Sequence, residues 1–323
     1  MQLSHTTIGD IADRTSVKLA DKMENNSNIR EAFQKAQGET EFYADGVFVH
    51  IRNAEGIAQW MEMKVGAFAK RLRGLSALPS EWHTRILPDP TLVYAFASIV
   101  DKEEFQKLCQ SMRRNLGVGG VSSALGDGAK WIWNVVREVF GRTEECLDVY
   151  HAAEHISDCG KVLFGESSSK TEWFERMRNV LLSEGLDGME RELSSLKVGL
   201  QESQTKLVNS LLEYLRNNSE RLNYCERLAE GRVIGSGLIE GACKNLVGRR
   251  LKQTLRQNHQ QSSQSPLQTR TTLSPHHTAR THRQLQQSRR TGGKHSLTKL
   301  CSGTGHTAPA LLECFLFSSE NLG

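Results

Sequence analysis

The sequence predicts an α/β fold, and three features indicate it. Two neighbouring segments, 41–52 and 60–70, alternate apolar and polar residues and are rich in β-branched and aromatic side chains, which is typical of paired strands. Two strand-to-helix units then follow each other at 119–141 and 145–165, and such a repetition implies parallel strands. The stretch 170–230 keeps helical spacing only, so we expect an all-helical insertion in this core.

The composition is that of a globular protein. With 323 residues, of which 38% are hydrophobic and 24% charged, the chain has room for one large domain plus an insertion or a small second domain. It contains no apolar run of about 18 residues, and residues 1–14 lack the build of a secretory signal. The seven cysteines are an odd number without a CxxC pair, which argues against a disulfide framework and a zinc ribbon. We therefore expect a reduced protein of the cytoplasm, with no membrane partner.

The formal net charge of +4 lies in the C-terminal stretch. Residues 255–323 carry eight of the 41 Lys and Arg residues but only two of the 37 acids. The preceding part is close to neutral. The basic character is therefore not the footprint of a folded DNA-binding surface.

Hydrophobic spacing places the first elements in chain order. Residues 3–36 keep helical spacing; together with their flanks (1–38) they form either the remnant of a helix-turn-helix DNA-recognition region or plain packing helices. The first part of the core, 39–165, begins with the two alternating strands, which a polar turn at 53–56 separates. Asp45 lies within the first of these strands.

Two further segments lead to the first strand-to-helix unit. Residues 91–100 could form a strand or a buried helix, because a short apolar run does not decide between them. Residues 101–117 are predicted to form an amphipathic helix. The unit itself has a short apolar strand, a tight turn at 126–128 that contains Asp127, and a helix over 129–140.

The last part of the chain changes character twice. After the helical insertion, assigned to 166–232, the core resumes at 233–254, where Ser236 is placed to cap a helix that begins at the next residue and carries Glu240. Beyond it, 255–323 is rich in Gln, Ser, Thr, Arg and His and has no period that could bury a face. We expect this tail to be disordered.

Three carboxylates stand out by position. Asp45 lies in a strand, Asp127 in the turn after another strand, and Glu240 near the start of a helix. A buried acid is unfavourable unless it is paired or binds a metal, and open α/β sheets gather ligands at the carboxyl ends of their strands. Two Mg²⁺ ions about 4 Å apart could be held by such acids and catalyse an in-line phosphoryl displacement. Position alone leaves the plain alternative open, since a single Asp is more often a turn or cap residue.

Several blocks of the sequence resemble the signature blocks of the ISKra-type insertion-sequence transposases. They are LGDGAKWIWN (125–134), LDVYHAAEH (147–155) and IGSGLIEGACKNLVGRRLKQT (234–254), while YADGVFVHIR (43–52) and WMEMKVGAFAK (60–70) resemble the family's first block. The blocks occur in the family's order, and the resemblance runs from about Leu3 to Thr254.

This resemblance implies an RNase H-like catalytic domain with a helical insertion before its last acid. The implied DDE triad is Asp45, Asp127 and Glu240, which would hold two Mg²⁺ or Mn²⁺ ions. The implied activity is metal-dependent strand cleavage and transfer, with transposon ends and target DNA as partners and a homo-oligomer as the assembly. Asp148 and His151 resemble a D-x-x-H signature found in several transposase groups, which implies a supporting role near the site, such as orienting DNA or the scissile phosphate.

Four cations follow Glu240 without an intervening acid: Lys244, Arg249, Arg250 and Lys252. Their spacing suits a phosphate track beside the metals. The helix dipole, which favours cations at a solvated helix end, accounts for the last three nearly as well.

Two alternatives compete with an active transposase. His151, Glu154 and His155 satisfy the H-x-x-E-H pattern of zinc peptidases, although a pattern with three fixed positions is easily met by chance. The second alternative is a catalytically inactive remnant that only binds DNA or self-associates. It follows from the break in the family pattern after Thr254, which suggests a frameshift, and from an N-terminal region shorter than is usual in the family.

Overall fold

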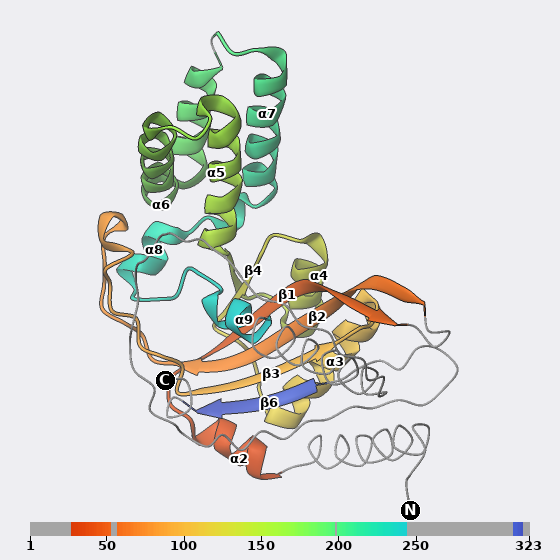
Figure 1. Ribbon diagram of the computed structural model, residues 1–323. Coiled ribbons are helices and arrows are strands. Elements are labelled where there is room, and N and C mark those ends of the chain that lie inside the picture. Colours follow the sequence, from red (N-terminus) through yellow and green to blue (C-terminus); the bar gives the residue numbers. More distant parts are fainter. Residues whose placement is uncertain (1–26, 53–56, 198, 244–312, 319–323) are drawn as a thin grey trace, which may run out of the picture.

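The computed structural model describes residues 27–52, 57–197, 199–243 and 313–318, and Figure 1 shows how their elements are arranged. A six-stranded mixed sheet forms the core, in the order β5-β4-β1-β2-β3-β6. A group of helices stands apart from this sheet (Figure 1). Within the described residues, no helix is both long and apolar enough to cross a membrane.

An antiparallel meander makes up one half of the sheet. β1 (Glu39–Arg52) and β2 (Ala58–Arg71) form a long hairpin, and β2 pairs with β3 (Leu92–Ser98) along its other edge. The two strands expected from alternation are confirmed. The ambiguous segment 91–100 contains a strand, and every residue of β3 is buried, which explains why it reads as a continuous apolar run without alternation.

The parallel half follows from the two strand-to-helix units. α3 (Lys102–Leu116) leads to β4 (Ser123–Gly126), which pairs in parallel with β1, and α4 (Lys130–Phe140) leads to β5 (Glu144–Leu147), which pairs in parallel with β4. Three antiparallel strands followed by two parallel ones, with helices in the crossovers, are an RNase H-like arrangement. The expected fold class is therefore confirmed.

Aromatic rings fill the face of the sheet that α3 and α4 cover. Phe42, Phe68 and Phe96 occupy one face of three neighbouring strands, with ring centroids 5.2 and 6.1 Å apart. Phe105 of α3 contacts Phe96 at 5.9 Å, and Phe140 of α4 contacts Phe42 at 4.9 Å. α2 (Ser27–Lys35) packs against α3. Asp45 lies on the opposite face of β1, where the segment that follows the helical insertion packs against the sheet.

The insertion is helical, as expected. α5 (Val149–Phe164) is followed by α6 (Ser168–Leu196), α7 (Glu202–Asn217) and α8 (Tyr224–Ala229), and α5 packs against both α6 and α7. Short 3-10 turns lie at Pro79–Glu81 and Ser219–Arg221. The chain then returns to the sheet with α9 (Gly237–Ala242), which contacts β1 and β2.

Six residues of the C-terminal stretch correct the expectation that all of 255–323 is disordered. They form β6 (Glu313–Ser318), which pairs antiparallel with β3 from Leu92 to Ala97. The outer edge of β3 offers backbone N–H and C=O groups for pairing, and a segment rich in Phe and Leu suits a strand. The rest of that stretch, and residues 1–26 of the expected N-terminal helices, lie outside the described residues.

Arg227 of α8 ties the helical insertion back to the sheet. Its side chain is only 1% exposed. Its Nη1 donates to Glu144 Oε1 of β5 at 2.5 Å, and its Nε donates to the backbone oxygen of Val233 at 2.8 Å. The guanidinium thus joins α8 to β5 and to the segment that leads into α9.

We predict that Arg227→Ala lowers the free energy of unfolding by about 3 kcal/mol, near the low end for removing one partner of a buried ion pair, because Arg232 still neutralises Glu144. Urea unfolding followed by circular dichroism measures the change. The control is Arg216→Ala, which removes an exposed pair with Glu190 and should cost less than about 1 kcal/mol. Equal losses in the two variants would contradict this role of Arg227.

Candidate active site

The register of β1 against β4 brings two of the expected acids level with each other. Tyr43 pairs with Leu125 in this parallel ladder. Asp45 lies two residues further along β1, and Asp127 lies two residues further along the chain, directly after β4. The chains stay close beyond the last pair, since a Cβ added at Gly126 would lie 3.4 Å from the backbone oxygen of Ala44. Burial raises the pKa of Asp45, and the charge of Asp127 raises it further. The two carboxylates therefore repel each other in the protein alone.

Asp127 is held in its turn from both sides. Its Oδ1 accepts a hydrogen bond from the backbone N–H of Ala129 at 2.8 Å, and its backbone oxygen accepts one from the Tyr214 hydroxyl at 3.2 Å. Gly128 follows with a φ of 94°, a conformation that favours glycine. Asp127 is thus a turn residue and, at the same time, a partly buried acid facing Asp45.

Asp45 faces the helix that carries Glu240. Its Oδ1 accepts a hydrogen bond from the N–H of Gly46 at 2.7 Å, and its Oδ2 lies 3.6 Å from the Sγ of Cys243. Cys243 directly follows α9 and is buried. Burial and the neighbouring Asp45 carboxylate raise the pKa of the Cys243 thiol. This thiol therefore stays protonated and donates to Asp45.

Glu240 is placed near the acid pair but does not close a metal site with it. It lies in the first turn of α9 with an exposed side chain, and its charge acts on Cys243 three residues later. Within the described residues, no three side chains of His, Cys, Asp or Glu come together closely enough to hold a metal ion. The structure assembles Asp45 with Asp127 and leaves Glu240 at the rim.

The chemistry of the acid pair suits a hard divalent cation. Carboxylate oxygens are the ligands that Mg²⁺ prefers. In both Asp45 and Asp127 one oxygen accepts a backbone N–H, which orients the carboxylate. A cation between them would also relieve the repulsion that raises the pKa of Asp45. These two residues therefore fit the expected ion in donor type, and among the described residues Glu240 does not join them in a complete set of three.

Asp148 lies directly after β5, beside the acid pair in the sheet. It is 8% exposed, and its carboxylate accepts hydrogen bonds from Tyr150 N, Ser236 N and Ser236 Oγ. Ser236 is the residue before α9, as expected, but its side chain makes no cap bond. The expectation of a side-chain cap is wrong, because the hydroxyl is bonded to a buried carboxylate that needs a donor.

His151 lies near the acids, whereas His155 points to the insertion. The charge of His151 lowers the pKa of both Asp45 and Asp148, opposing the larger effect of burial. The His155 ring lies 4.0 Å from the Tyr214 ring, and partial burial together with the charge of His151 lowers its pKa.

The residues of the H-x-x-E-H pattern are not arranged as a metal centre. The His151 and His155 rings are 5.3 Å apart, and His151 Nδ1 lies 3.8 Å from Glu154 Oε2. In the part of the chain that the structure describes, these residues do not belong to any group of three His, Cys, Asp or Glu side chains that could hold a metal ion.

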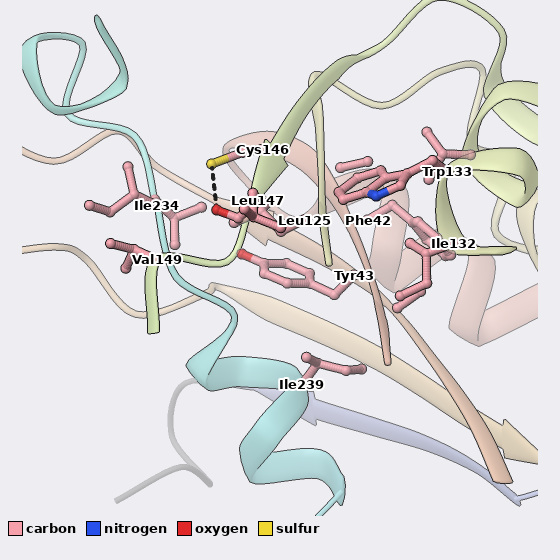
Figure 2. Packing of buried hydrophobic residues seen from close by; sticks show 14 of the residues in the cluster. Phe42, Tyr43, Leu125, Ile132, Trp133, Cys146, Leu147, Val149, Ile234 and Ile239 are labelled. Atoms are coloured by element: carbon pink, nitrogen blue, oxygen red, sulfur yellow. Dashed lines mark hydrogen bonds between the residues drawn. The ribbon is translucent and has the colours of Figure 1, made fainter. Parts of the chain in front are cut away.

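Buried apolar side chains pack between the strands that carry the acids and the segment that returns to the sheet, and Figure 2 shows several of them. Tyr43 of β1, Leu125 of β4 and Leu147 of β5 come from three neighbouring parallel strands, and Ile234 and Ile239 come from the segment that returns to the sheet. Close packing of these side chains holds the strands and the returning segment together next to the site.

Two residues that contact the acids, Tyr214 and Cys243, were missed by sequence reasoning. Tyr214 belongs to the insertion, where nothing in the local pattern marks it. Cys243 could have been found, since it is one helical turn after Glu240 in the same block. The four cations, Lys244, Arg249, Arg250 and Lys252, lie outside the described residues.

No protein-family model matches the sequence, and no curated protein is similar enough to it to count as a relative.

We predict that Asp45→Asn stabilises the protein without divalent cations at neutral pH. Because the pKa of Asp45 in the folded protein lies above its ordinary value, folding favours the protonated acid, and the native protein loses stability as pH rises through that range. The amide should raise the free energy of unfolding at pH 8 by about 1 kcal/mol or less. This gain should shrink as the pH approaches 4.

Urea unfolding at both pH values, with a chelator present, tests this. Asp187→Asn, a change at an exposed acid of α6, is the matched control and should stay within about 0.5 kcal/mol of the parent. A loss of stability in Asp45→Asn at pH 8 would show that the acid pair is not strained.

Proposed function

We propose that this chain is a DDE-type DNA transposase of an insertion sequence, with Asp45, Asp127 and Glu240 as its acidic triad. The observation that carries the proposal is the level placement of two acids in an RNase H-like sheet, Asp45 within β1 and Asp127 directly after the adjacent strand β4. The resemblance of the surrounding blocks to ISKra-type transposases supports it. The proposed partners are transposon ends and target DNA, and the proposed assembly is a homo-oligomer that acts on DNA in the bacterial nucleoid.

The proposed reaction is strand cleavage and transfer by phosphoryl transfer. Asp45 and Asp127 would hold two Mg²⁺ or Mn²⁺ ions, with Glu240 completing the set, and such ions supply an activated nucleophile and stabilisation of the leaving oxygen. Water and then a DNA 3′-hydroxyl would be the nucleophiles. The protein's own contribution is orientation: the N–H groups of Gly46 and Ala129 each fix one carboxylate oxygen.

No covalent protein–DNA intermediate is part of this proposal. Cys243 is a nucleophilic side chain in contact with Asp45, and the raised pKa of its thiol keeps it protonated. A protonated thiol is a poor nucleophile. Its role here is to donate to Asp45 and to fill the space between α9 and β1.

A second candidate function is a catalytically inactive remnant. The exposed position of Glu240 favours it, because an RNase H-like site without its third acid would not be complete. The strand β6 favours an intact catalytic domain instead, since part of the unusual C-terminal stretch joins the sheet. A zinc peptidase is the weakest alternative, because the two histidines and Glu154 do not gather as ligands.

We predict that the chain nicks supercoiled plasmid in the presence of Mn²⁺ or Mg²⁺. Asp127→Asn should lower the nicking rate by about 100-fold or more, since the ions contribute several kcal/mol to the transition state. Asp187→Asn should nick like the parent. Agarose gels of nicked against supercoiled plasmid measure the rates. Equal nicking by the parent and Asp127→Asn would leave only the remnant.

We also predict that Mg²⁺ or Mn²⁺ stabilises the folded protein. At ten times the Kd, binding should add about 1.4 kcal/mol to the free energy of unfolding, which a thermal shift assay detects as a rise in Tm. The rise should be lost in Asp45→Asn and in Asp127→Asn, because each removes a ligand. A rise produced by stoichiometric Zn²⁺ alone, and lost in His151→Ala, would favour the peptidase instead.

A further inference from the structure

The Asp148 carboxylate is shared between two distant parts of the chain. Its Oδ1 accepts the N–H of Tyr150 at 3.0 Å, which caps α5, and also the N–H of Ser236 at 3.1 Å. Its Oδ2 accepts the Ser236 hydroxyl. An ordinary helix cap needs only the first of these bonds. The other two reach 88 residues along the chain, to the residue directly before α9.

The backbone around Asp148 makes the same connection. The N–H of Asp148 donates to the oxygen of Gly126 at 2.8 Å, and the N–H of Val149 donates to the oxygen of Ile234 at 3.0 Å. The chain therefore bonds on one side to the residue before Asp127 and on the other to the segment that leads into α9. A Cβ at Gly235 would lie 2.6 Å from the Tyr150 ring, so a larger residue would have to displace this ring for the segment to pass.

α9 depends on such an anchor. It has six residues, and a helix this short is not stable by itself. Ile239 is buried against the core and Cys243 reaches Asp45. Ser236 is four residues before Glu240, which is about 6 Å along a helix. The orientation of the first turn, and with it the place of the Glu240 side chain, follows from where Ser236 is held.

We propose that Asp148 is a positioning residue, whose hydrogen bonds to Ser236 hold α9 so that Glu240 and Cys243 stay beside the Asp45–Asp127 pair. The catalytic meaning of this clamp rests on the proposed transposase function. Both carboxylate oxygens of Asp148 already accept hydrogen bonds and the residue is buried. Asp148 thus acts through Ser236 and does not itself contact DNA.

The reactivity of the Cys243 thiol measures whether the Asp148–Ser236 contact, here called the clamp, holds α9 in place. This measurement does not require catalytic activity. It is buried at the end of α9, so release of the helix exposes its thiol to a maleimide. Labelling at each cysteine is followed by peptide mass spectrometry at pH 8, in the absence of metal and DNA. Cys109 and Cys146 are fully buried in the core, and their labelling reports global unfolding.

Ser236→Ala and Asp148→Asn should each speed labelling of Cys243 by about ten- to a hundred-fold, the range for losing a hydrogen bond to a charged group. Labelling of Cys109 should not change. The double variant should not exceed the larger single effect, because both changes remove the same contact. Ser236→Thr, which keeps the hydroxyl, should restore the parent rate.

Ser167→Ala is the matched control. Ser167 also precedes a helix, and its hydroxyl accepts the N–H of Lys170 at the exposed start of α6. Its hydroxyl bonds only within the α5–α6 junction, to Phe164 and Lys170, among the hydrogen bonds of the described residues, so Cys243 labelling should stay at the parent rate.

Plasmid nicking tests whether the position of α9 affects catalysis. Ser236→Ala should raise the Mn²⁺ concentration needed for half-maximal nicking and lower the maximal rate by about ten-fold, while Ser236→Thr nicks like the parent. Cys243 labelling that is unchanged in Ser236→Ala would overturn the proposal. If Asp148→Asn loses nicking while its Cys243 labelling stays at the parent rate, Asp148 acts directly on DNA. Faster labelling in a parent chain that never nicks plasmid would keep the clamp and reject the proposed function. If Asp148→Asn does not fold, Ser236→Ala decides, since it retains one of the two bonds.

Discussion

The parallel pairing of β1 with β4 is the contact on which the site depends. β1 is the central strand: it also pairs with β2, so its position is fixed along both edges. Side chains alternate along a strand, and a slip of one residue would move Asp45 to the face that Phe42 shares with the helices. The aromatic layer of Phe42, Phe68 and Phe96 therefore specifies which way Asp45 points. A packing constraint on one face of the sheet creates the acid pair on the other.

Buried charge then joins the returning chain to this sheet. Arg227 bonds β5 to the segment before α9, and Asp148 bonds the end of β5 to Ser236. The Arg227 guanidinium and the Asp148 carboxylate lose their contacts with water on folding. Hydrogen bonds to elements far away in sequence replace those contacts. Tyr214 adds a contact from α7 to the Asp127 turn. The helical insertion is thus connected to the sheet through Arg227 and to the Asp127 turn through Tyr214.

Local patterns were sufficient for most elements. The strands at 41–52 and 60–70 follow from alternation, and the helix over Lys102–Leu116 follows from its apolar stripe, with Asp101 as a cap and Gly117 in the left-handed conformation after it. The segment 91–100 could not be decided, because β3 is covered on both faces and lacks alternation. β6 was missed because its pairing partner is more than 200 residues away, and no local composition shows that such an edge exists.

The sequence by itself determined most of the strands and helices, the parallel strands of the two strand-to-helix units, and the elements on which the three acids lie, because periodicity and turn chemistry are local properties. The tertiary structure alone decided what each acid does. Strand register placed Asp45 level with Asp127, burial gave Asp148 to Ser236, and the packing of a short helix left Glu240 exposed. These outcomes depend on contacts between residues some 80 to 200 positions apart, and the energy of a carboxylate is set by what surrounds it in space.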